Sequence, residues 1–151
     1  MQKNDLWQSK FLQHLQHERN LSPNTVSAYI RDIDKLTSFC EQADIGSWEN
    51  LRSHHLREFL AKGHQEGLSG RSQQRSLSSI RAFYNFLNRE GFVRHNPAHQ
   101  LSAPKSHQKL PKTLDADQVS KLLDVQGNKW HTIRDRAILE LFYSSGLRLS
   151  A

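Results

Sequence analysis

Apolar residues recur three and four positions apart along most of this chain, which is the spacing of an amphipathic helix. No stretch stands out with the strict alternation that a half-buried strand requires. Before residue 103 the pattern predicts four helices, at about 6–18, 22–42, 53–67 and 69–91. We therefore expect an all-α domain of four helices over residues 1–103.

The ends of these helices carry their own signals. Ser22 is a good N-cap for the second helix, and Pro23 suits the first helical position because it has no amide proton to leave unpaired. Gly67 follows the third helix and Gly91 the fourth, and glycine favours the left-handed conformation that ends many helices. Within the second helix, Cys40 occupies an apolar position and is predicted to lie in the core.

The composition changes after the fourth helix. Residues 104–112 combine prolines and lysines with little to bury, which predicts an extended basic linker. Beyond it, Asp115 and Gln118 have the spacing of a capping box, and a further apolar stripe covers 132–146. Two helices rarely bury a core alone, so residues 113–151 are expected to be the truncated beginning of a second domain.

The overall composition excludes several classes of protein. Hydrophobic residues make up 36% of the chain, with no run long enough to span a membrane and no secretory signal at the N-terminus. A single cysteine rules out an internal disulfide and fits a reducing compartment. The histidines do not combine with cysteine or carboxylate at metal-ligand spacings. We expect a cytoplasmic protein with no membrane association, metal, cofactor or small-molecule ligand.

Positive charge is concentrated in one segment of the chain. The net charge is +6, and residues 69–112 contain eight lysines and arginines against one acid, Glu90, which gives that segment +7. The rest of the chain therefore sums to −1. A concentrated basic segment on a nearly neutral remainder indicates a protein that binds nucleic acid.

The fourth predicted helix separates its apolar residues from a polar side that holds the candidates for DNA contact. They are Arg71, Gln74, Arg75, Ser78 and Arg81, with Lys105 following on the linker. Arginine and glutamine bind phosphates and base edges, and a small residue such as Ser78 lets the helix approach the DNA backbone. The alternative is an ordinary solvated surface, but such surfaces usually mix charges of both signs.

A weaker candidate site lies at the start of the second predicted helix. Thr25 and Arg31 offer a hydroxyl and a cation near the helix N-terminus, where backbone amides can hold a phosphate. Hydroxyl residues at this position are also ordinary helix caps, and the local pattern by itself favours that role.

Taken in order, three parts of the chain resemble tyrosine recombinases of the Xer group. ERNLSPNTVSAYIRDIDKLTSFC, residues 18–40, is similar to the opening of that family's core-binding, SAM-like domain, and residues 67–105 resemble its final helix, turn and linker. LPKTLDADQVSKLL and IRDRAILELFYSSGLRLS resemble the start of the catalytic domain. The resemblance covers essentially the whole chain and is closer to the XerC branch than to XerD.

The resemblance implies DNA breaking and rejoining through a tyrosine nucleophile. Arg148, within GLR, matches the family's first catalytic arginine, whose guanidinium stabilises charge on the phosphate oxygens. Ala151 stands where the family usually has glutamate, and Tyr29, Tyr84 and Tyr143 match no nucleophile motif. The nucleophile and the other catalytic residues are expected downstream, so this chain is expected to bind DNA without cleaving it.

By the same resemblance, the domain binds one half-site of double-stranded DNA. The complete protein is expected to act with a XerD-like recombinase in a heterotetramer that resolves chromosome dimers at cell division. Three alternatives remain open from the sequence. They are a phage or mobile-element integrase, a helical module that binds an acidic protein, and a natural truncation that occupies recombination sites and blocks the full enzyme.

Overall fold

The computed structural model of the chain describes residues 2–102, 113–124 and 126–146. Every regular element in these ranges is a helix, which confirms the predicted all-α fold. The chain divides into two compact units, Met1–His107 and Gln108–Ala151. The division falls within the predicted linker at 104–112, which lies outside the described residues, so the predicted domain limits stay a prediction.

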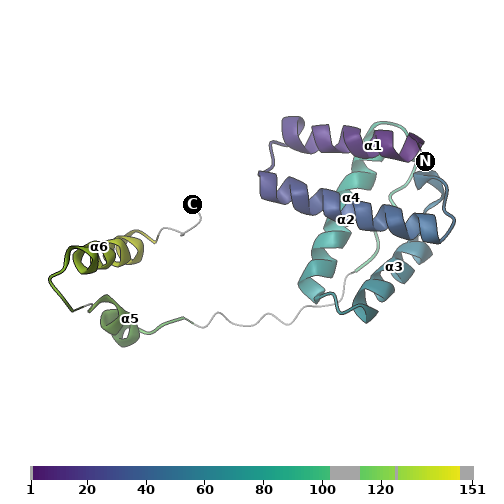
Figure 1. The fold of residues 1–151 in the computed structure, drawn as a ribbon. Coiled ribbons are helices and arrows are strands. Elements are labelled where there is room, and N and C mark those ends of the chain that lie inside the picture. Colours follow the sequence, from purple (N-terminus) through teal and green to yellow (C-terminus); the bar gives the residue numbers. More distant parts are fainter. Residues whose placement is uncertain (1, 103–112, 125, 147–151) are drawn as a thin grey trace. The chain divides into compact units, whose positions relative to one another are not determined.

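The described part of the first unit contains four α-helices and two short helical turns. They are α1 (Gln2–Gln13), the π-helical turn η1 (His14–Glu18), α2 (Pro23–Gln42), the 3₁₀ turn η2 (Trp48–Asn50), α3 (Ser53–Gln65) and α4 (Gly70–Arg89). The helices α1 and α2 pack side by side, and α4 crosses them and also contacts α3 (Figure 1). Because α4 packs against all three other helices, only a narrow sector of it remains at the surface.

The core of the first unit is built around α4. Five large side chains on its inner side are at most 1% exposed: Leu77, Ile80, Phe83, Tyr84 and Leu87. The Tyr84 hydroxyl donates to the Trp48 carbonyl oxygen at 2.9 Å, and burial raises the pKa of this phenol. Cys40 is buried on α2, as predicted. Packing of this kind fixes the rotation of α4 and therefore which of its residues reach solvent.

The predicted end signals of α2 and α4 are confirmed. The Ser22 hydroxyl accepts from the Thr25 amide at 3.3 Å, and Pro23 is the first residue of α2. Ser69 caps α4 in the same way, accepting from the Ser72 amide at 3.2 Å. Gly91 has φ +72°, a left-handed conformation that lets the chain turn away after α4.

The second unit contains two helices among its described residues, α5 (Ala116–Leu123) and α6 (Trp130–Ser145). The capping box predicted for α5 is confirmed, since Asp115 accepts from the Gln118 amide at 2.8 Å and Gln118 accepts from the Asp115 amide at 3.1 Å. Neither helix has a buried residue. The exposed apolar side chains include Leu122, Trp130, Ile133, Ile138 and Leu141.

Candidate nucleic-acid interface

The surface sector of α4 begins with four polar residues on one side of the helix. Arg71, Gln74, Arg75 and Ser78 stand at positions i, i+3, i+4 and i+7, so they form a single strip, called the α4 strip below. All four are exposed. The Ser78 hydroxyl donates to the Gln74 carbonyl oxygen at 2.9 Å. The sequence of α4 contains no acidic residue, so no acid on the helix itself neutralises the two arginines of the strip.

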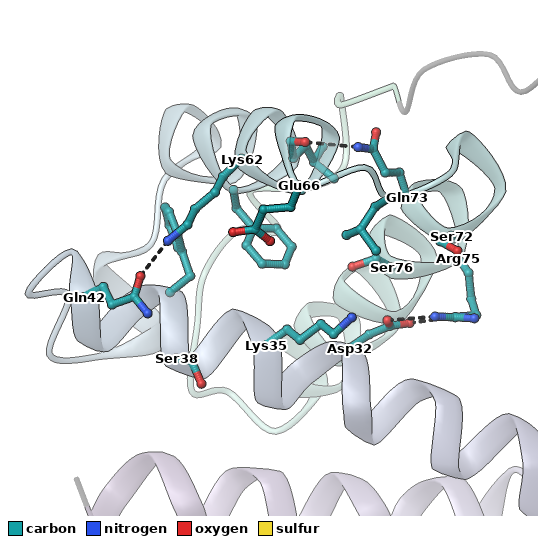
Figure 2. Close-up of a pocket in the computed structure, with 15 residues that line it drawn as sticks. Asp32, Lys35, Ser38, Gln42, Lys62, Glu66, Ser72, Gln73, Arg75 and Ser76 are labelled. Atoms are coloured by element: carbon teal, nitrogen blue, oxygen red, sulfur yellow. Dashed lines mark hydrogen bonds and ion pairs between the residues drawn. The ribbon is translucent and has the colours of Figure 1, made fainter.

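Arg75 is held by a buried carboxylate on α2 (Figure 2). Its Nε donates to Oδ2 of Asp32 at 3.0 Å, and its Nη2 donates to Oδ1 at 3.2 Å. The Ser79 hydroxyl donates to the same Oδ2 at 3.0 Å. The Asp32 side chain is 3% exposed and the Arg75 side chain 46%, so the ion pair reaches from the seam between α2 and α4 to the surface. The hydrogen bonds from Arg75 to Asp32 raise the pKa of the guanidinium above its ordinary value.

Asp32 is a functional candidate that the sequence pattern did not single out. The signal that could have found it is an acidic residue at the edge of the apolar stripe of α2, next to Ile33. Burying a charge is costly unless it is paired, so an acid at such a position indicates a cationic partner elsewhere in the fold. The sequence alone could not identify that partner as Arg75, which lies 43 residues further along the chain.

An open pocket of about 290 Å³ lies beside the α4 strip, between α2, α3 and α4 (Figure 2). Its apolar lining comes from Phe39, Phe59, Leu60 and Leu68, and its charged lining from Asp32, Lys35, Lys62, Glu66 and Arg75. Lys62 donates to Oε1 of Gln42 at 2.7 Å. Lys35, on α2, lines the same pocket as Arg75. The structure therefore places a further cation near the α4 strip.

Arg81 occupies a different environment from Arg71 and Arg75. Its Nε donates to the carbonyl oxygen of Ala98 at 3.0 Å, and its Nη2 donates to that of Leu101. The residue is half-buried and holds the segment after α4 against the helix. Two of its N–H groups therefore serve the fold, and the DNA contact predicted for Arg81 stays a prediction.

The weaker pair of candidates on α2 is locally bonded. The Thr25 amide and hydroxyl both contact the Ser22 hydroxyl, at 3.3 and 2.9 Å, so Thr25 takes part in the helix cap. Arg31 is exposed, and its Nε donates to the Ser27 carbonyl oxygen at 3.3 Å. Arg31 stands one helical turn before Lys35, which places both cations on the same side of α2.

Two predicted site residues, Lys105 and Arg148, lie outside the described residues. Within the described ranges, no three His, Cys, Asp or Glu side chains are grouped as a metal site would require. None of the helices in the same ranges has the length and apolar character of a membrane span.

Comparison with protein families gives a match to the phage integrase N-terminal SAM-like domain over residues 9–91. That range contains α2, α3 and α4 and part of α1, and therefore the whole α4 strip and Asp32.

The chain is also similar to curated tyrosine recombinases. It is 51% identical over 142 residues to tyrosine recombinase XerC of Pseudomonas syringae pv. syringae, a match that covers 93% of this chain and 47% of that protein. It is 50% identical over 141 residues to tyrosine recombinase XerC of Pseudomonas aeruginosa, covering 93% of this chain and 46% of the relative. The chain thus spans about half the length of the curated relatives it matches.

Among solved structures, the integrase from mycobacterium phage Brujita aligns with a TM-score of 0.58. The alignment covers 97% of this chain and 46% of the integrase, at 22% sequence identity. At that level of identity the likeness concerns the fold alone.

Proposed function

Because the chain belongs to the phage integrase N-terminal SAM-like family, we propose that it is the DNA-binding part of a XerC-like site-specific tyrosine recombinase. About half of its residues are identical to those of the Pseudomonas XerC proteins over 93% of its length. The complete protein then catalyses DNA recombination and integration by breaking and rejoining strands, and this part of it selects the site.

The observation that carries the proposal is the α4 strip, an exposed row of arginine, glutamine and serine without an acid on its helix. An α-helix fits the major groove of B-DNA, which is about 12 Å wide. Arg71 and Arg75 present planar donor groups that can bind guanine edges or phosphate oxygens with two hydrogen bonds. Gln74 can bind adenine in the same manner, and the short Ser78 allows the helix close to the backbone.

The candidates on α2 take the supporting role in this arrangement. Thr25 lies at the helix N-terminus, and Arg31 and Lys35 extend the basic surface along α2. Contacts of this kind go to phosphates and fix the position of the protein on the duplex without reading sequence. We assign the same role to Lys105 on the linker.

The proposal extends to the complete protein through its relatives. Arg148 takes the position of the first catalytic arginine and stabilises charge on the phosphate during strand transfer. The complete protein works in the cytoplasm with a XerD-like recombinase in a heterotetramer that resolves chromosome dimers. A phage or mobile-element integrase would use the same domain at a different target site.

A selection experiment tests the proposal without requiring that the target sequence be known beforehand. The 151-residue chain is incubated with a library of random duplexes, and the bound fraction is sequenced over several rounds. We expect one enriched motif of half-site length, and the enrichment should be lost in Arg75→Ala. Recovery of unenriched sequences would contradict sequence-specific binding and favour the alternative of a helical module that binds an acidic protein.

The same chain should not cleave DNA. Incubation with the selected duplex, followed by a denaturing gel, should show no covalent protein–DNA adduct, because no tyrosine of this chain matches the nucleophile motif. An adduct would show that the chain carries its own nucleophile.

A further inference from the structure

We propose that Asp32 is a positioning residue for DNA recognition, which fixes the guanidinium of Arg75 in the orientation that reads the site. The inference rests on the proposed function and assigns a role to a residue that does not itself reach the DNA. Asp32 is buried on α2, whereas the group it positions stands on the α4 strip.

The geometry of the ion pair leaves the outer edge of the guanidinium available. Asp32 accepts from Nε and from one N–H of Nη2. The group is planar and has five N–H donors, so both on Nη1 and the second on Nη2 remain, and one from each of these nitrogens points along the outer edge. No acceptor for Nη1 is found among the described residues. With the side chain 46% exposed, this edge is free to meet a phosphate or the O6 and N7 atoms of guanine.

The carboxylate is itself held in place. The Ser79 hydroxyl, 0% exposed, donates to Oδ2 of Asp32. Asp32 and Ser79 both lie in the seam between α2 and α4, where packing restricts their rotamers. The Asp32 carboxylate is therefore held rigidly, and its two hydrogen bonds to Arg75 restrict the guanidinium in turn.

A fixed arginine binds more selectively than a free one. Immobilising a long side chain on binding costs about 0.5–1.5 kcal/mol, which corresponds to about twofold to twelvefold in affinity. Asp32 imposes this order before DNA arrives, so the cost does not reduce the affinity for the correct site. The same carboxylate lowers the local positive charge, which weakens sequence-independent attraction to phosphates. Both effects raise the ratio of specific to non-specific binding.

A purely structural ion pair makes a different prediction. If Asp32 and Arg75 only hold α2 to α4, then breaking the pair lowers stability and reduces binding to every duplex alike. If Asp32 positions Arg75, then removing its charge lowers affinity for the selected duplex and leaves affinity for a scrambled duplex unchanged or raised. The ratio of the two dissociation constants separates the two roles.

The test compares Asp32→Asn with the parent chain on the selected and scrambled duplexes by fluorescence anisotropy. We expect the ratio of the scrambled to the selected dissociation constant to fall by about twofold to twelvefold. Asp34→Asn is the matched control, because Asp34 lies on the same helix, is exposed and changes the net charge by the same amount. The control should leave the ratio within about twofold of the parent.

Ser79→Ala provides a second variant if Asp32→Asn fails to fold. It removes one hydrogen bond to Asp32 and keeps every charge, and it should lower the ratio in the same direction by a smaller factor. In an Arg75→Ala background, Ser79→Ala should have no further effect on the ratio, because the group that is positioned is gone.

The outcomes distinguish this inference from the proposed function. If Arg75→Ala lowers the ratio and both Asp32→Asn and Ser79→Ala leave it unchanged, the positioning role is wrong and the proposed function stands. If the variants weaken binding to both duplexes equally, the pair is structural and the inference is overturned. If the parent does not discriminate between duplexes, the proposed function fails and the inference fails with it.

Discussion

The thiol of Cys40 lies on the inner side of α2, and burial raises its pKa to about 12. The neighbouring charge of Glu41 acts in the same direction. Since the thiolate is the reactive form, the folded protein should react with a disulfide reagent at pH 8 about a thousandfold more slowly than the unfolded chain. Absorbance of the released thiol measures both rates. Comparable rates with and without denaturant would contradict the burial of this residue.

Arg81 stabilises the fold through hydrogen bonds to the segment that follows α4. Arg81→Ala removes hydrogen bonds to the Ala98 and Leu101 carbonyl oxygens, so the free energy of unfolding should fall by about 2 kcal/mol. Urea denaturation measures the change. Arg94→Ala is the control, since it removes the same charge from an exposed position in the next segment. Equal stability of the two variants would show that the bonds of Arg81 contribute nothing.

At the scale of residues, the sequence pattern distinguished buried from exposed positions in the first unit. It did not distinguish the roles of the arginines. Arg75 and Arg81 share the polar side of one helix, and the pattern predicts the same role for both. Their difference comes from partners distant along the chain, Asp32 for one and Ala98 and Leu101 for the other. Which side chains meet across a fold depends on how the helices pack, which local periodicity does not specify.

At the scale of elements, one ion pair joins the turn η1 to the end of α4. Nη1 of Arg89 donates to Oε2 of Glu18 at 2.8 Å, and Nη2 donates to Oε1 at 3.4 Å. These hydrogen bonds, together with the imidazole of His14, whose Nδ1 lies 2.9 Å from Oε2, hold the pKa of Glu18 below its usual 4.5. A carboxylate with a lowered pKa stabilises the fold above its unfolded pKa, and this contribution is lost as the pH falls through the folded pKa.

Because the pKa of Glu18 is lowered, the stability difference between Glu18→Gln and the parent should depend on pH. The melting temperature of the variant should lie slightly below that of the parent at pH 7, and the difference should shrink as the pH is lowered below 4.5. Because the pair is exposed, the difference should also shrink with added salt. Calorimetry of both proteins from neutral to acidic pH measures it. A difference that is constant over this range would exclude the ion pair as its source.

The elements of the first unit were largely predictable because capping residues and apolar periodicity agree. Ser22 and Pro23 mark the start of α2 that the structure confirms, and α4 begins within one residue of its predicted limit. The π-helical turn at His14–Glu18 was not predicted, since the apolar stripe of 6–18 continues through it without a signal. In the second unit, the stripe of α6 is suited to burial but Ile133 and Leu141 are exposed, as expected for two helices that rarely bury a core alone. A stripe shows which side is suited to burial but does not supply the surface that covers it.

At the scale of the whole molecule, the basic segment and the family match overlap at α4. Residues 69–112 carry +7 while the whole chain carries +6, and the α4 strip lies within this segment and within the range matched by the integrase domain family. The chain spans about half the length of its curated relatives. We propose that the first unit recognises DNA and that Arg148 is this chain's contribution to catalysis.

The central claim is that the α4 strip reads DNA sequence. Its most direct test is a fluorescence-anisotropy titration of parent, Arg71→Ala and Arg57→Ala chains against selected and scrambled duplexes at several salt concentrations. Both variants lose one exposed arginine, but Arg57 is on α3 and is not part of the strip. We predict that Arg71→Ala weakens binding to the selected duplex by about tenfold, whereas Arg57→Ala changes it by less than about twofold. Equal losses for the two variants on both duplexes would show that only net charge matters, and would contradict the claim.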